Sequence, residues 1–101
     1  MGTVSLPIIF RPEARAEFDE AHDWFASQNP GWGEAFADRV QEVLDRIATM
    51  PKMHAVVFGN VRKAVVMRFP YCVFYREETS CVRVLSVFHT SRDPQIWKSR
   101  A

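Results

Sequence analysis

Four side chains in the second half of the chain are of the types that catalyse phosphate chemistry. His89 ends a valine-rich run and is followed by Arg92, while Arg62 and Arg68 belong to an earlier run. A histidine titrates near neutral pH and can act as general base or acid, and a guanidinium can neutralise a phosphate. These four residues are the candidate catalytic set if the chain is a nuclease. The alternative for His89 is structural, because a residue at the end of a strand can bond the turn that follows.

Motifs that would indicate other chemistry are absent from the sequence. There is no phosphate-binding loop, dinucleotide turn, metal-binding helix or nucleophile elbow. Cys72 and Cys81 match no zinc spacing. The expected strand register puts Cys72 opposite Leu85 and Cys81 opposite Arg76, too far apart for a disulfide. We therefore expect no metal and no cofactor, and reduced thiols in a cytoplasmic protein.

The candidate residues lie on or beside three consecutive β-rich runs, residues 61–69, 71–76 and 82–89. Valine, phenylalanine and tyrosine dominate these runs and suit a pleated, half-buried surface. The turns between them are short, which forces antiparallel pairing because parallel neighbours need a long crossover. The sequence predicts a three-stranded antiparallel meander.

The first half of the chain predicts the elements that cover this sheet. Residues 6–10 are predicted to form a short strand, which Pro7 confines to an edge or a strand start. Apolar residues at helical spacing predict helices over residues 13–28 and 32–50, separated by an Asn-Pro-Gly turn. Helices joined so closely should lie as an antiparallel hairpin.

The remaining segments complete one predicted domain over residues 1–101. A connector after the second helix includes a short strand near residues 55–58, and a helical turn near residues 93–100 ends the chain. The predicted fold is α+β with the order β-α-α-β-β-β, in which an antiparallel sheet packs on the helix hairpin.

One face of the predicted sheet combines arginines with apolar side chains. Strand parity places Val87 and His89 on this open face, and Ser86 and Phe88 under the helices. A basic and partly apolar face fits a protein partner, although solvated arginines laid along the sheet are the alternative. The predicted partner-binding residues are Arg62, Arg68, Phe74, Arg76, Arg83, Leu85, His89, Arg92 and Trp97.

The overall charge limits the classes of partner. The chain carries 13 basic and 12 acidic residues, a formal net charge of +1. Such a balance argues against a surface that neutralises many phosphates, although a local basic patch remains open. The apolar runs are too short and too often interrupted to span a membrane, so no membrane partner is expected.

Several segments together form a recognisable pattern. They are Ala14-Arg15-Ala16-Glu17-Phe18, Val61-Arg62-Lys63-Ala64, Arg68-Phe69-Pro70-Tyr71, Phe74-Tyr75-Arg76, and Val84 to Pro94 with Trp97. This pattern resembles the RelE/ParE superfamily of bacterial toxins over roughly residues 8–100. Its most specific part is the His-x-x-Arg-Asp-Pro ending after a valine-rich strand.

The resemblance implies the toxin half of a type II toxin–antitoxin pair, of the kind often carried on plasmids for their maintenance. It also implies a cognate antitoxin of the ParD or RelB kind, which would wrap an extended and helical segment over the toxin. A hetero-oligomer of toxin and antitoxin is therefore expected.

Two activities divide the superfamily, and the chain departs from the pattern of one of them. RelE-like members cut messenger RNA on the ribosome with clustered lysines and arginines, whereas ParE-like members inhibit DNA gyrase. Here Cys72 occupies the position of a RelE arginine, and only Lys63 of a RelE lysine pair remains. The RelE pattern also has an arginine just after the last strand, whereas here His89 and Thr90 intervene before Arg92. The resemblance thus favours a gyrase inhibitor that is not a nuclease. The alternatives are a ribosome-dependent endoribonuclease using His89 and the arginines, or a non-toxic binding homologue.

Overall fold

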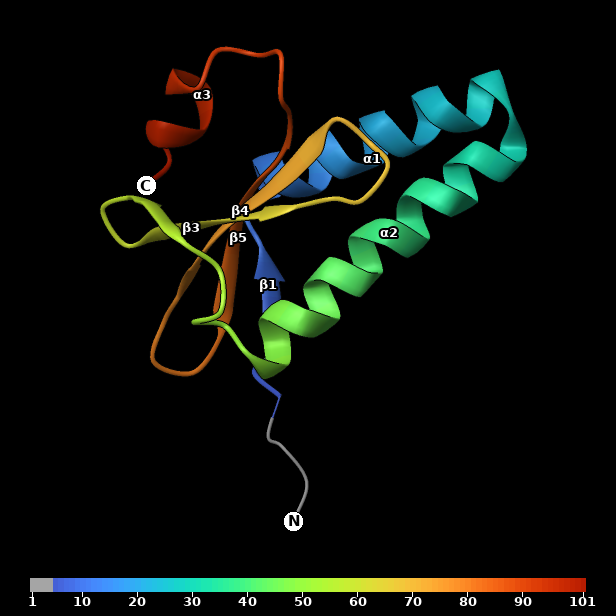
Figure 1. The fold of residues 1–101 in the computed structure, drawn as a ribbon. Coiled ribbons are helices and arrows are strands. Elements are labelled where there is room, and N and C mark those ends of the chain that lie inside the picture. Colours follow the sequence, from blue (N-terminus) through green and yellow to red (C-terminus); the bar gives the residue numbers. More distant parts are fainter. Residues whose placement is uncertain (1–4) are drawn as a thin grey trace.

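The structure, a computed structural model, describes residues 5–101 as a five-stranded sheet with three helices (Figure 1). The elements are β1 (Ile8–Phe10), α1 (Pro12–Gln28), α2 (Pro30–Thr49), β2 (Val56–Phe58), β3 (Val61–Val65), β4 (Tyr71–Glu77), β5 (Val82–His89) and α3 (Gln95–Lys98). The strand order is β1-β5-β4-β3-β2. The predicted α+β fold is confirmed, and the short strand indicated near residues 55–58 is β2.

The sheet is mixed rather than fully antiparallel. Strands β3, β4 and β5 form the predicted antiparallel meander, but β1 pairs parallel to β5, with Ile8 opposite Val82 and Phe10 opposite Val84. The prediction of an antiparallel sheet is therefore wrong at this edge. The strands β1 and β5 come from opposite ends of the chain, so no short turn sets their relative direction.

The helices α1 and α2 form the predicted hairpin. Pro12 and Pro30 lie in their first turns, where the missing backbone N–H has no helical partner. The Asn29 side chain caps α2 by accepting a backbone hydrogen bond of 2.9 Å. The two helices approach closely at Gly33, where an added Cβ would lie 2.8 Å from the Ala26 Cβ. No helix within residues 5–101 is long and apolar enough to cross a bilayer.

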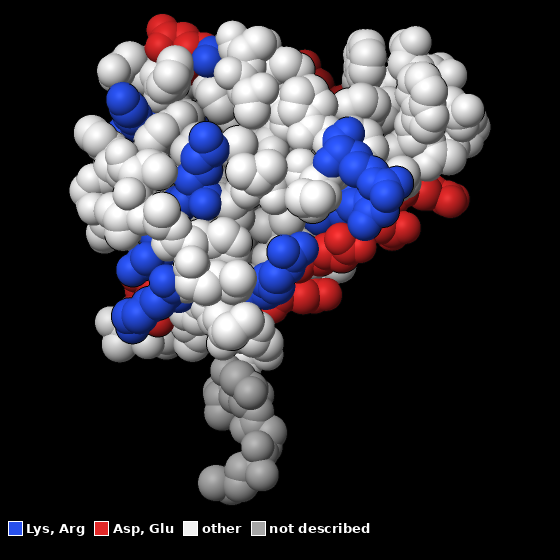
Figure 2. Space-filling model, viewed as in Figure 1, with Lys and Arg blue, Asp and Glu red and all other residues white. Residues whose placement is uncertain are grey.

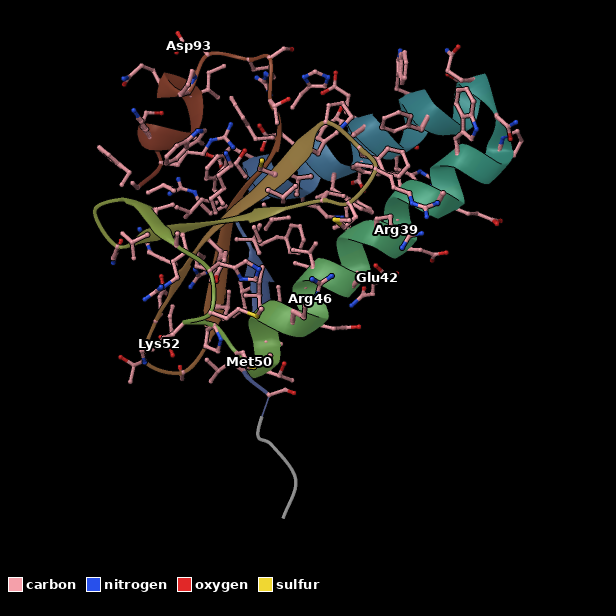
Figure 3. All side chains as sticks on the ribbon, viewed as in Figure 1. Arg39, Glu42, Arg46, Met50, Lys52 and Asp93 are labelled. Atoms are coloured by element: carbon pink, nitrogen blue, oxygen red, sulfur yellow. The ribbon has the colours of Figure 1, made fainter. Side chains whose placement is uncertain are left out.

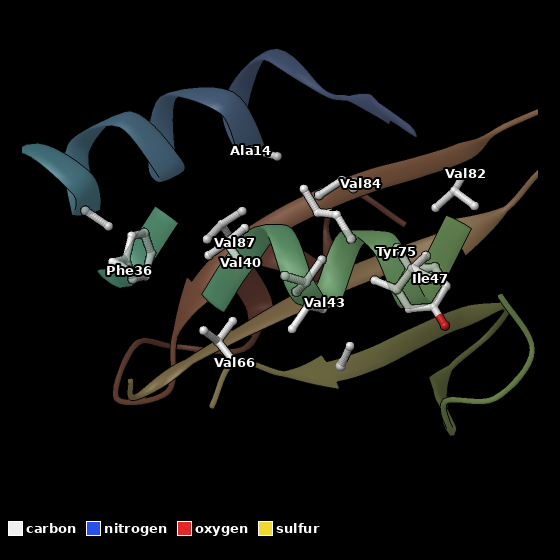
Figure 4. Packing of buried hydrophobic residues seen from close by; sticks show 14 residues of the cluster. Ala14, Phe36, Val40, Val43, Ile47, Val66, Tyr75, Val82, Val84 and Val87 are labelled. Atoms are coloured by element: carbon white, nitrogen blue, oxygen red, sulfur yellow. The ribbon is translucent and has the colours of Figure 1, made fainter. Parts of the chain in front are cut away.

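The main core lies between the hairpin and one face of the sheet (Figure 4). Its centre is Phe36, which is fully buried and contacts the rings of Phe25, Phe69 and Tyr71. Removing such a ring from a packed core costs about 3–5 kcal/mol. The remaining buried members from α2 and the sheet include Val40, Val43, Leu44, Ile47, Ala64, Val66, Val73, Tyr75, Val82, Val84 and Val87.

A second, smaller core covers the other face of the sheet beneath α3. The Trp97 ring stacks on Phe74 with centroids 3.9 Å apart, and Leu85 and Phe88 complete the cluster with Val61 and Cys72. Leu85 is fully buried, and Phe74 and Trp97 are each only 5% exposed. The expectation of an open face is therefore wrong at its centre. The chain folds back after β5 because burying a tryptophan removes a large apolar area from water.

A bulge in β5 explains why the predicted faces differ from those observed. Phe74 pairs with Ser86 but the next residue, Tyr75, pairs with Val84, which leaves Leu85 as an extra residue. An extra residue shifts the register and changes which side chains share a face beyond it. Parity counted from the sequence alone is therefore valid only on one side of the bulge.

The register prediction is wrong as a consequence, although the conclusion about the thiols stands. Cys72 lies opposite Phe88 rather than Leu85. Both Cys72 and Cys81 are free and buried.

The assignment of residues to faces also changes. Val87 packs under the helices and Phe88 packs under α3, the reverse of the prediction. His89 contacts the ring of Tyr71 beside the helix hairpin. On β3, Ala64 belongs to the main core beneath the helices. Arg62 is two residues before Ala64 and therefore lies on the same face of β3, not on the face of the arginines of β4 and β5 as predicted.

Candidate functional site

A hollow lies between α1 and the adjacent ends of β4 and β5. Its volume is about 680 Å³. We call it the α1 groove, and it is lined by Glu17, Glu20, Ala21, Trp24, Phe25, Pro70, Tyr71, Val87, His89 and Arg92. It contains two of the predicted partner-binding residues, His89 and Arg92, and combines aromatic walls with charges of both signs.

Glu17 anchors the floor of the α1 groove. Its side chain is 10% exposed, and its Oε1 accepts hydrogen bonds from Ser86 Oγ at 2.8 Å and Arg100 Nη1 at 2.8 Å. The same oxygen accepts from the Val87 backbone N–H at 3.3 Å, and Oε2 accepts from Arg92 Nη1 at 3.1 Å. One carboxylate thus ties α1 to β5 and to the C-terminal segment.

The walls of the α1 groove are aromatic. Trp24 is 58% exposed and meets Phe25 edge to face at 5.1 Å. On the opposite wall the Tyr71 and His89 rings lie 5.0 Å apart, also edge to face. Burial raises the pKa of the Tyr71 hydroxyl, and the nearby Glu20 carboxylate adds to the rise. Exposed aromatic residues beside charges are typical of protein-binding surfaces.

His89 has the structural contact that its position at a strand end suggested. Its Nδ1 accepts a hydrogen bond of 3.1 Å from the Ser91 backbone N–H and lies 2.7 Å from Ser91 Oγ. In the neutral ring the proton is then on Nε2. The imidazole is half-buried and lines the groove.

The predicted arginines of β4 and β5 lie in a separate cluster at the β4–β5 turn. Arg76 Nε donates to Glu78 at 3.0 Å, and Arg83 Nη2 donates to the same carboxylate at 3.2 Å. Hydrogen bonds from Arg83 and then Arg76 lower the pKa of Glu78 to about 2. The carboxylate stays ionised at neutral pH and offsets the charge of these arginines.

Arg62 lies away from His89, whereas Arg68 precedes the Pro70–Tyr71 segment that pairs with the end of β5. Arg62 Nη1 donates to the carbonyls of Lys52 at 3.2 Å and His54 at 2.6 Å, and Arg68 adopts a positive φ of 71° in the β3–β4 turn. Arg62 lies opposite Tyr75 on one side of β4, and His89 lies opposite Tyr71 on the other. Strand geometry separates them by roughly 16 Å. The structure therefore brings His89 and Arg92 together but not the whole candidate catalytic set.

Cations are also dispersed on the face of the molecule that Figure 2 shows. Figure 2 shows lysine and arginine side chains in separate spots on this face rather than in one patch. Several are paired with carboxylates, such as Arg39 with Glu42 at 3.1 Å on the outer face of α2 (Figure 3). Within residues 5–101 no cluster of three or more metal-ligating side chains is present.

Sequence reasoning missed Glu17 as a site residue because acidic residues on helices usually face solvent. The signal was its spacing. Glu17 lies three residues after Ala14 and four before Ala21, both buried, so it shares their stripe. A carboxylate in such a stripe must find buried donors.

Comparison with known proteins agrees with this architecture. Residues 8–94 match the family described as "ParE toxin of type II toxin-antitoxin system, parDE". A solved structure described as "Chromosomal ParDE TA system from P. aeruginosa" has a TM-score of 0.74 and 14% sequence identity, covering 88% of this chain and 100% of that chain. At that identity the likeness shows the fold alone. No curated protein matches the chain. Since the family match spans most of the residues, the chain belongs to the ParE toxin family of type II toxin–antitoxin systems.

Proposed function

We propose that this toxin acts in the cytoplasm by binding and inhibiting DNA gyrase, and that a cognate ParD-like antitoxin neutralises it. The observation that carries the proposal is the match to the ParE toxin family over residues 8–94. The proposed mode of action is binding to a macromolecule, with no chemical step.

The arrangement of side chains supports binding over RNA cleavage. Electrostatic stabilisation of a phosphorane requires cations gathered around one point. Arg62 lies away from His89 and donates to backbone carbonyls, and Arg92 is paired with Glu17. Cys72 is buried, and a cysteine carries no positive charge in either of its protonation states.

The surface we propose for the gyrase contact is the α1 groove. Trp24 projects from α1 at its rim, and tryptophan is enriched among the residues that dominate binding energy. His89 and Arg92 supply polar contacts on the opposite wall. A hollow with an aromatic anchor and polar groups around it suits an inserted segment of a protein partner.

The test is supercoiling of relaxed plasmid by purified DNA gyrase with increasing amounts of the toxin. We expect the intact protein to inhibit supercoiling and Trp24→Ala to inhibit at least about thirtyfold less, because truncating a binding hot spot costs at least about 2 kcal/mol. Trp32→Ala is the matched control, since Trp32 is 52% exposed on the same hairpin but does not line the groove.

Two results would overturn the proposal. One is unchanged supercoiling at a large excess of folded protein. The other is cleavage of messenger RNA on translating ribosomes that is lost in His89→Ala, which would indicate the nuclease alternative instead.

A further inference from the structure

A second groove lies on the other face of the sheet, between β3 and α3. Its volume is about 320 Å³, and its floor includes the side chains of Val57, Phe74 and Phe88. We call it the β3–α3 groove. Lys63 and Lys98 line it, and no acidic residue does. Its chemistry therefore differs from that of the α1 groove, where charges of both signs meet.

The two lysines are positioned to receive carboxylates. The chain contains three lysines, and among the described residues only Lys52 forms an ion pair, with Glu77 at 3.2 Å. Lys63 is exposed on β3. Lys98 Nζ lies 5.5 Å from the Phe58 ring centroid and 5.8 Å from that of Trp97, which holds its charge beside the groove.

The strand beside this groove favours an extended occupant. β2 is the terminal strand of the sheet, and all three of its residues are exposed and apolar. Proteins normally protect such an edge with charges, proline or a covering segment. Val65, 59% exposed on the neighbouring strand, extends the apolar surface. An extended segment that lies along this face would cover these apolar side chains.

A nucleic acid fits this groove less well than a peptide. Single-stranded RNA or DNA binds by stacking bases on open aromatic faces. Trp97 is only 5% exposed, with one face stacked on Phe74 at 3.9 Å and the Phe58 ring edge-on to it at 6.0 Å. The apolar floor suits valine- or leucine-like side chains, and the lysines at the rim suit glutamate or aspartate.

We propose that the β3–α3 groove binds an extended segment of a protein partner in which acidic and apolar side chains alternate. The inference deepens the antitoxin part of the proposed function and does not depend on gyrase as the target. The occupant is the segment by which such a partner holds the toxin, with Lys63 and Lys98 as its charged anchors.

The test uses the full-length protein and a synthetic peptide of alternating glutamate and valine. We expect amide signals of Val57, Lys63 and Thr90 to shift in NMR titrations. Lys63→Glu and Lys98→Glu should each weaken binding about tenfold at low salt, because an attraction is lost and a repulsion gained. Lys52→Glu, the same change of charge outside the groove, should change it less than about twofold. If Lys98→Glu fails to fold, Lys63→Glu alone decides.

Three outcomes would overturn the inference: no binding at millimolar peptide, equal weakening by Lys52→Glu, or tighter Lys63-dependent binding of a single-stranded oligouridylate. Gyrase assays on the same variants separate it from the proposed function. A protein that binds the peptide but leaves supercoiling unchanged contradicts only the gyrase claim. One that inhibits gyrase but does not bind the peptide contradicts only the inference about this groove.

Discussion

Replacing Glu17 should release the C-terminal segment and destabilise the fold. The carboxylate accepts four hydrogen bonds, two of them from Arg92 and Arg100. In Glu17→Ala the Arg100 side chain, only 13% exposed, would lose its counter-charge, and the fully buried Ser86 hydroxyl would lose its acceptor. Breaking a buried ion pair costs about 3–5 kcal/mol. That is a large fraction of the roughly 5–15 kcal/mol that stabilises a domain.

Urea unfolding followed by two probes measures this effect. The chain has three tryptophans, so a Trp24→Phe, Trp32→Phe background leaves Trp97 as the single fluorophore, reporting on α3. Far-UV circular dichroism reports on the helices. We expect Glu17→Ala to lower the free energy of unfolding by about 3–5 kcal/mol. In this variant the red shift of Trp97 emission should occur at a lower urea concentration than the loss of the helical circular dichroism signal.

Two further variants make the test specific. Glu17→Gln keeps the shape and one acceptor oxygen but removes the charge, so its effect should be about 1.5–3 kcal/mol. Glu20→Gln, at an exposed position of the same helix, should change the free energy by less than about 0.5 kcal/mol. If Glu17→Ala unfolds at the same urea concentration as Glu20→Gln with Trp97 emission unchanged, Glu17 is not the anchor of the C-terminal segment.

Three other predictions concern the fold. Gly33→Ala should destabilise the hairpin by about 1–3 kcal/mol in denaturant unfolding, because its Cβ would lie 2.8 Å from that of Ala26, and adding Ala26→Gly should restore part of the loss. Arg68→Gly should raise the free energy of unfolding by about 0.5–1 kcal/mol, because Arg68 has a φ of 71°, and a loss of stability would disprove strain there. Burial raises the pKa of Tyr75 from 10 to about 12, so the unfolded state releases the phenolic proton first. The contribution of Tyr75 to stability should be constant below about pH 10 and fall toward pH 12, and unfolding curves of Tyr75→Phe should lack that part of the fall.

Local signals in the sequence were sufficient for the elements. The apolar stripes placed the helix ends within about two residues of those observed, although Pro30 and Gly31, predicted as part of a turn, belong to the first turn of α2. Short turns fixed the direction of β3, β4 and β5, and Pro7 correctly indicated an edge strand. Each of these features depends on residues close together in the chain.

Features that depend on distant residues were not predictable in the same way. The parallel pairing of β1 with β5 has no local signal. The bulge at Leu85 leaves the alternating pattern of β5 looking regular, so Val87 and Phe88 were assigned to the wrong faces. Trp97 was expected on a free surface, but its contact with Phe74 requires the chain to fold back after β5.

The candidate site was predicted only in part for the same reason. His89 and Arg92 follow directly from the end of β5 and do line the α1 groove. Trp24 and Glu17 come from α1, and only the packing of that helix on the sheet brings them to the same hollow. The role of all four in binding stays a prediction.

Hydrogen–deuterium exchange of the toxin with and without purified DNA gyrase tests the central claim most directly. Segments that line the α1 groove, residues 17–25 and 87–92, should exchange more slowly in the presence of gyrase, while the backbone around Trp32 should be unchanged. Unaltered exchange throughout the chain, or protection confined to β2 and α3, would contradict the account.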